Sequence, residues 1–115
     1  SDGGGDVPVD ASSIMNDGVV RFDIKLVTAP ANADAPWLFK IESADTSTAV
    51  EFALTASQEG AEPVVGEWQT YTYSLQQLFD AGLDISAIDV LMVFPLWGKG
   101  EGAVYRLDNV VITTP

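Results

Sequence analysis

The sequence contains no cysteine and no histidine. Their absence excludes disulfide bonds, metal sites built on thiolate or imidazole, and nucleophile systems of the Ser-His-Asp and Cys-His types. Carboxylates, amines, guanidinium groups, hydroxyls and phenols are the groups left for chemistry. Because exported bacterial modules often lack cysteine, the redox compartment stays open.

Basic residues are also scarce, since Lys and Arg together number five against 17 acidic residues. The resulting net charge of −12 repels phosphate, so nucleic acids and anionic membranes are not expected as partners. No apolar run approaches the 18 residues of a membrane span. We therefore expect a mature protein or an excised module whose acidic excess is mostly solvated surface.

What the sequence does contain is enough apolar material for a core. Of the 115 residues, 47% are hydrophobic, and eleven are Trp, Tyr or Phe. This composition predicts one folded domain and excludes a disordered chain. The opening "SDGGGD" is typical of a linker. Residues 1–17 are expected to be a linker or a partial first strand, and residues 18–115 a single domain.

Alternation of apolar and polar residues predicts a series of short strands. After a turn signal at residues 16–18, Phe22 and Ile24 point to one side and Arg21 and Lys25 to the other. Further strands are predicted at residues 37–43, 48–56, 68–75, 87–96 and 103–113, with one short helix at 75–82. Short strands separated by turn signals predict an all-β fold, an antiparallel β-sandwich.

The inward register of these strands predicts the core: Phe22, Ile24, Phe39, Ile41, Phe52, Leu54, Tyr71, Tyr73, Val90 and Met92. The outward register carries charges of both signs, expected on one sheet face: Arg21, Asp23, Lys25, Lys40, Glu42 and Glu51. Two interpretations stay open for this face. It is either a solvated surface with ordinary cross-strand pairs, or a polar floor that hydrogen-bonds sugar hydroxyls.

Two stretches carry a family resemblance, "GEWQTYTYSLQQLFDAGLDISAIDVLMVFP" and "GAVYRLDNVVI". They resemble the galactose-binding-like β-sandwich modules attached to secreted polysaccharide-degrading enzymes, including accessory modules of exo-β-glucanases and marine-type β-1,3-glucanases. The resemblance implies a jelly-roll sandwich, secreted by a marine bacterium. It also implies a monomeric, non-catalytic carbohydrate-binding module that targets an appended glycoside hydrolase to polysaccharide. Laminarin-type β-glucan is the first expected ligand, before agar-type galactan and alginate.

The resemblance implies that loop or sheet aromatics stack on sugar rings. Trp97 stands in the glycine-rich stretch "PLWGKGEG", so we expect it to bind ligand, with Lys99 and Glu101 beside it. The alternative is that this indole folds back onto the core. Trp37 is the expected second aromatic, although its register with Phe39 also allows a core position. Arg21, Lys40 and Glu42 complete the expected ligand-binding set.

The third tryptophan, Trp68, receives two conflicting indications. Its register with Thr70 and Thr72 turns it away from Tyr71 and Tyr73. The resemblance, however, implies that a tryptophan following "GE" packs in the core or at the sheet edge. The second indication sets our expectation here.

A structural calcium ion is a further expectation from the resemblance. Asp108 in "RLDNV" would supply a carboxylate, and Asp6 or Asp10 the partner ligand. Alternatively, Asp108 caps a turn or pairs with Arg106 or Lys25.

Catalysis is not expected. "GKGEG" lacks the spacing of a phosphate loop. Glu42 and Glu51 on neighbouring strands are the nearest approach to a glycosidase carboxylate pair, and nothing else marks them as one. The competing interpretations of function are a structural spacer or protein-docking sandwich and, more remotely, a small lyase.

Overall fold

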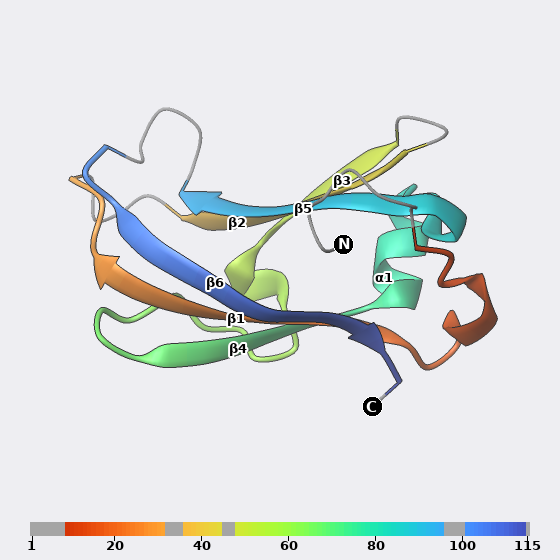
Figure 1. Cartoon of the computed structure of the whole chain (residues 1–115), viewed down its shortest axis with the longest axis horizontal. Coiled ribbons are helices and arrows are strands. Elements are labelled where there is room, and N and C mark those ends of the chain that lie inside the picture. The colour runs from red at the N-terminus through yellow and green to blue at the C-terminus, as the bar shows by residue number, and fades with distance from the viewer. Residues whose placement is uncertain (1–8, 32–35, 45–47, 96–100, 115) are drawn as a thin grey trace.

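The computed structural model describes residues 9–31, 36–44, 48–95 and 101–114. Two antiparallel three-stranded sheets lie face to face (Figure 1). One sheet has the order β4-β1-β6, with β4 at Trp68–Ser74, β1 at Val19–Thr28 and β6 at Val104–Thr113. The other has the order β3-β2-β5, with β3 at Ala49–Ala53, β2 at Trp37–Ser43 and β5 at Ile88–Pro95. The predicted all-β sandwich is confirmed.

One short α-helix, α1 at Leu75–Asp80, follows β4 and lies at one end of the two layers (Figure 1). It begins there because the Ser74 hydroxyl accepts a hydrogen bond from the backbone N–H of Gln77 at 3.0 Å. Single 3₁₀ turns occupy Ser12–Ile14 (η1), Leu54–Ala56 (η2) and Ile85–Ala87 (η3). Among the described residues, no helix has the length and apolar character needed to cross a membrane.

The core lies between the sheets and is built on an aromatic cluster. The ring of Phe22 in β1 lies 5.2 Å from that of Phe39 in β2, and Phe39 lies 4.6 Å from Tyr73 in β4. Tyr71 stacks on Phe22 at 5.9 Å. Offset aromatic pairs of this kind add to the stabilisation that burial alone gives. The predicted core positions in β1, β2 and β4 are therefore confirmed.

Two predicted core positions in β5 are wrong. Val90 is 37% exposed, and Met92 is only partly buried, opposite Lys40 on the outer face. Val93 and Leu91 turn inward instead. The residues from Val90 to Phe94 are all apolar, so their sequence carries no alternation from which the phase of the strand can be read.

The two buried tyrosines differ in what their hydroxyls contact. The hydroxyl of Tyr73 donates to the carbonyl of Ala53 at 2.7 Å. The hydroxyl of Tyr71 has no hydrogen-bond partner among the described residues, although Tyr71 is 1% exposed. Burial, together with the charges of Glu62 and Glu59, raises the pKa of Tyr71 to about 12. Burial also raises the pKa of Tyr73.

Residues 9–17 pack against the folded unit, which agrees with the alternative of a partial first strand rather than a linker. Val9 forms an antiparallel bridge with Ile88 at the start of β5. The backbone N–H of Ala11 donates to the backbone carbonyl of Ile85 at 2.8 Å, and the side chain of Ala11 is buried in the core. This segment covers the first residues of β5, which is otherwise an edge strand.

Gly18 is a close-approach position between this segment and β1. A Cβ atom at this glycine would lie 2.6 Å from the carbonyl oxygen of Ile14 and 2.6 Å from a methyl group of Leu75. Both distances are shorter than packed atoms adopt. Any side chain here would therefore force the η1 turn away from β1 and α1.

The charged residues expected on one face lie on two. β1 belongs to one sheet and β2 to the other, so Arg21, Asp23 and Lys25 lie on the opposite side of the sandwich from Lys40 and its neighbours. The alternation indicated correctly which residues point outward. It contained no information on which strands share a sheet, because strand pairing depends on the route of the chain between them.

Candidate binding face

The outer face of the β4-β1-β6 sheet presents three rows of side chains across the strands. The strand register aligns Trp68, Lys25 and Arg106 in the first row; Thr70, Asp23 and Asp108 in the second; and Thr72, Arg21 and Val111 in the third. Residues directly opposite each other on antiparallel strands have Cβ atoms about 5 Å apart. We call the first two rows, with Asn109, the Trp68 face.

Of the two tryptophans that the structure describes, Trp68 in the first row has the more accessible indole. Trp68 is 49% exposed, at the start of β4 and directly opposite Lys25 in β1. Arg106 lies on the other side of Lys25 and is exposed. Trp68 does not pack in the core, as its register with Thr70 indicated, but it lies on β4, an edge strand of its sheet, so the edge alternative agrees with the structure.

The second row is held by hydrogen bonds on the carboxylate of Asp23. Its Oδ1 accepts from the hydroxyl of Thr70 at 2.7 Å, and its Oδ2 accepts from the side-chain amide of Asn109 at 2.8 Å. Asn109 has a positive φ of 54°, within the shift in the pairing of β1 with β6. A left-handed residue at a bulge re-aims its side chain, which brings the Asn109 amide across the strand to Asp23.

The third row is partly covered at its β4 end, where Glu59 lies over Thr72. The carboxylate of Glu59 accepts from the backbone N–H and the hydroxyl of Thr72, both at 2.7 Å. Thr72 is buried as a result, although its side chain points away from the core. The accessible polar surface of this sheet is thus concentrated in the first two rows.

The cations on the outer face of this sheet have no carboxylate partner among the described residues. Within the part of the chain that the structure describes, no carboxylate oxygen lies within 4.0 Å of the charged nitrogens of Arg21, Lys25 or Arg106. Arg21 and Lys25 are half-buried, and Arg106 is exposed. Sequence reasoning placed Arg21 and Lys25 on a polar face but did not bring Arg106 to it, because the proximity of Lys25 and Arg106 arises only from the pairing of β1 with β6.

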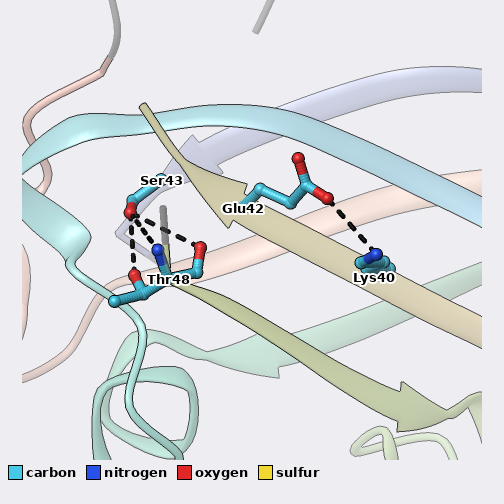
Figure 2. A network of polar contacts seen from close by, with 4 residues as sticks. All are labelled: Lys40, Glu42, Ser43 and Thr48. Atoms are coloured by element: carbon cyan, nitrogen blue, oxygen red, sulfur yellow. Dashed lines mark hydrogen bonds and ion pairs between the residues drawn. The ribbon is translucent and has the colours of Figure 1, made fainter. Parts of the chain in front are cut away.

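The opposite sheet holds the other predicted charged residues. Figure 2 shows Lys40 and Glu42 on β2, where the Lys40 ammonium lies 3.3 Å from a Glu42 carboxylate oxygen. In the same view, the hydroxyl groups of Ser43 and Thr48 lie 2.7 Å apart and tie the end of β2 to the residue before β3. Lys40 and Glu42 therefore do not join Arg21 in one site, contrary to the single polar floor expected.

The same sheet carries the carboxylates considered for catalysis. Glu51 lies directly opposite Lys40, and Glu42 lies opposite Ala49 on the neighbouring strand. Both glutamates thus flank one lysine. Opposite charges in this arrangement are an ordinary cross-strand cluster on a solvated face.

The predicted loop site is only partly within the described residues. Trp97 and Lys99 lie outside them, so their role stays a prediction. Glu101 is exposed, and its backbone carbonyl accepts from the N–H of Ala31 at 2.7 Å. The turn at Glu101 leads directly into β6, at the end of the sheet where β1 finishes.

Trp37, the expected second aromatic, is a core residue. It is 4% exposed, and its ring meets that of Tyr105 edge to face at 4.9 Å. A tryptophan this buried has no free ring face to offer a sugar. The core alternative for Trp37 is therefore correct, and its inward register with Phe39 was the reliable signal.

The expected calcium site at Asp108 stays a prediction. Calcium needs six to eight oxygen ligands. Asp108 Oδ1 accepts from the backbone N–H of Asn109 at 2.8 Å, and both oxygens of Asp23 opposite are engaged as described above. Asp10 instead accepts a hydrogen bond from the backbone N–H of Ser12, beside the other sheet, and Asp6 lies outside the described residues. Among the described residues, no group of three or more carboxylates is arranged to hold a metal ion.

Comparisons of the chain with protein-family models, with curated proteins and with solved structures found no match.

Proposed function

We propose that this domain is a non-catalytic carbohydrate-binding module and that it binds polysaccharide on the Trp68 face. The observation that carries the proposal is the half-exposed indole of Trp68, placed on a sheet surface beside hydrogen-bonding groups. A large aromatic ring is costly to leave in water. A flat ring with few rotatable bonds, however, binds the apolar face of a pyranose with little loss of entropy.

The second row supplies the polar half of such a site. Sugar hydroxyls are both donors and acceptors, so they need partners of both kinds at fixed positions. Asp23 accepts hydrogen bonds, while Thr70 presents a hydroxyl group and Asn109 a side-chain amide beside it. Because these three residues come from three different strands, their spacing is fixed by the sheet rather than by a loop.

The module acts by raising the local concentration of an attached catalytic domain at its polysaccharide substrate. In the parent chain, we propose, it keeps an appended glycoside hydrolase close to insoluble or gel-forming polysaccharide in the extracellular medium. The resemblance places laminarin-type β-glucan first among the ligands, followed by agar-type galactan and alginate. A spacer or protein-docking domain is the competing function.

The test compares two exposed aromatic residues of equal accessibility. Trp68 and Phe79 are both 49% exposed, but Phe79 lies on α1, away from the Trp68 face. Affinity gels containing laminarin, agarose or alginate would be run with the parent protein, Trp68→Ala and Phe79→Ala. Loss of aromatic stacking, about 1–3 kcal/mol by analogy with base stacking, predicts binding weakened by about 5- to 150-fold in Trp68→Ala alone.

Two results would contradict the proposal. If no polysaccharide retards the parent protein, the spacer or docking function is favoured. If Trp68→Ala and Phe79→Ala bind as well as the parent, glycan binding takes place elsewhere, and the loop containing Trp97 becomes the next candidate. Melting curves of both variants serve as the control for folding.

A further inference from the structure

We infer that the ligand of the Trp68 face is an anionic polysaccharide, with a carboxylate or sulfate group bound between Lys25 and Arg106 while a sugar ring stacks on Trp68. The inference rests on the proposed function and narrows its ligand class. It reverses the order that the resemblance suggests, because it favours charged glycans over neutral β-glucan.

The first observation is a like-charge pair that has no counterion among the described residues. Lys25 and Arg106 are direct cross-strand partners, so their charges project from neighbouring points on the same face. Like charges directly opposite each other destabilise a sheet. The chain has 17 acidic residues, yet none of the described ones places a carboxylate within 4.0 Å of either cation. An anion bound between the two would remove the repulsion and accept charge-assisted hydrogen bonds from both.

The second observation is the line formed by the three residues of the first row. Trp68, Lys25 and Arg106 lie on three adjacent strands, which are about 4.8 Å apart. The indole and the guanidinium therefore start from points roughly 10 Å apart, with the ammonium between them. A sugar ring on the indole thus has the cations beside it, where a carboxylate or sulfate substituent of that ring or the next would lie.

The second row limits how a charged ligand can lie. Asp23 and Asp108 carry negative charge next to the first row, so a second anionic group placed over them would be repelled. Hydroxyl groups, in contrast, can donate to these carboxylates. The face is therefore suited to a pyranose that presents its anionic group on one edge and hydroxyls on the other.

Distant charges oppose this ligand less than the net charge of −12 suggests. At physiological ionic strength, interactions beyond about 8 Å are largely screened. The carboxylates on the other sheet, such as Glu42 and Glu51, lie across the thickness of the sandwich, where two packed sheets are about 10 Å apart. The carboxylates of the other sheet therefore contribute little, and the charges that act on a bound anionic group are the two cations of the first row and, farther from it, Asp23 and Asp108.

The experiment measures ligand preference by isothermal titration calorimetry at roughly physiological ionic strength. The ligands are oligosaccharides of matched length: an oligouronate, a sulfated oligogalactan and neutral laminari-oligosaccharides. The proteins are the parent, Lys25→Gln, Arg106→Gln, the double variant, and Lys40→Gln. The last removes one positive charge from the opposite sheet and serves as the matched control.

We expect at least one anionic oligosaccharide to bind the parent roughly tenfold or more tightly than the neutral one, as expected for charge-assisted hydrogen bonds. Each single glutamine variant at Lys25 or Arg106 should lose several-fold in affinity for that ligand, and the double variant should lose the preference. Lys40→Gln should keep it. Preference for the oligouronate alone, the sulfated ligand alone or both would each support the inference and identify the anionic group.

Three outcomes would overturn it. Equal binding of neutral and anionic oligosaccharides, lost in Trp68→Ala but kept in the double variant, would reject the anionic ligand and leave the proposed function standing. Binding of polyglutamate as tight as that of the oligouronate would show a site for acidic peptides instead. Absence of binding to every glycan, with all proteins folded, would reject the proposed function itself.

Discussion

Replacing Tyr71 by phenylalanine should leave the domain equally stable or slightly more stable, whereas the same change at Tyr73 should destabilise it. Both side chains are almost completely buried, and both rings pack in the same aromatic cluster. Each substitution removes one oxygen atom and keeps the ring. The two variants therefore differ only in what the hydroxyl contacts.

The expected magnitudes follow from those contacts. At Tyr73 the variant loses a 2.7 Å hydrogen bond and leaves the Ala53 carbonyl without this donor. The cost is about 1–2 kcal/mol, equivalent to a fall in melting temperature of roughly 3–10 °C for a domain of this size. At Tyr71 the hydroxyl has no partner among the described residues. Removing it avoids a desolvation cost, partly offset by the small void, and should stabilise by about 0–1 kcal/mol.

The assay is urea unfolding followed by tryptophan fluorescence, with the midpoint and slope determined for the parent and both variants. Unchanged slopes would show that differences in midpoint report differences in stability. If Tyr71→Phe is destabilised as much as Tyr73→Phe, the Tyr71 hydroxyl has a partner in solution, and the reasoning about its orphan state is wrong.

Above pH ~10 the free energy of unfolding should decrease as pH rises, because the pKa of Tyr71 is near 10 in the unfolded chain but about 12 in the folded state; a urea midpoint that stays constant between about pH 9 and 11.5 would contradict this. Gly18→Ala should cost about 1–3 kcal/mol in thermal melts, because its methyl group meets Leu75 and backbone, and a variant as stable as the parent would show that this packing relaxes. EDTA should leave the melting temperature unchanged; a fall that is absent in Asp108→Ala would instead establish a calcium site. If polysaccharide binding survives in Trp68→Ala, Trp97→Ala should weaken it by about one to two orders of magnitude with little change in melting temperature, and unfolding of this variant would identify Trp97 as core.

The fold could be predicted because most strands alternate cleanly. In β1, every second residue from Val20 to Leu26 is buried, as the sequence indicates. The sequence does not indicate which face of β5 points inward, because both of its faces are apolar, and Val90 was predicted on the wrong side. The strand predicted at residues 48–56 also ends early, since the chain turns at Leu54 into η2 while keeping that side chain in the core.

The candidate site was harder to predict than the fold. Local alternation turned Trp68 outward, but the family resemblance outweighed it and placed the indole in the core or at an edge. Lys25 and Arg106 lie far apart in the sequence, and only strand pairing brings them together. Local patterns thus predict the side of the sheet on which a residue lies, while its neighbours across the sheet depend on topology.

The pairing of β1 with β6 has a consequence for biosynthesis. Val19, the first residue of β1, lies opposite Thr113, the last residue of β6, so the central strand of this sheet cannot gain its second neighbour until synthesis has reached β6. Closing so long a loop before any contact repays it slows folding. Until β6 arrives, the nascent chain would expose one edge of β1 together with the inner face of the sheet. A truncation before β6 should therefore yield an aggregation-prone chain rather than a smaller stable domain.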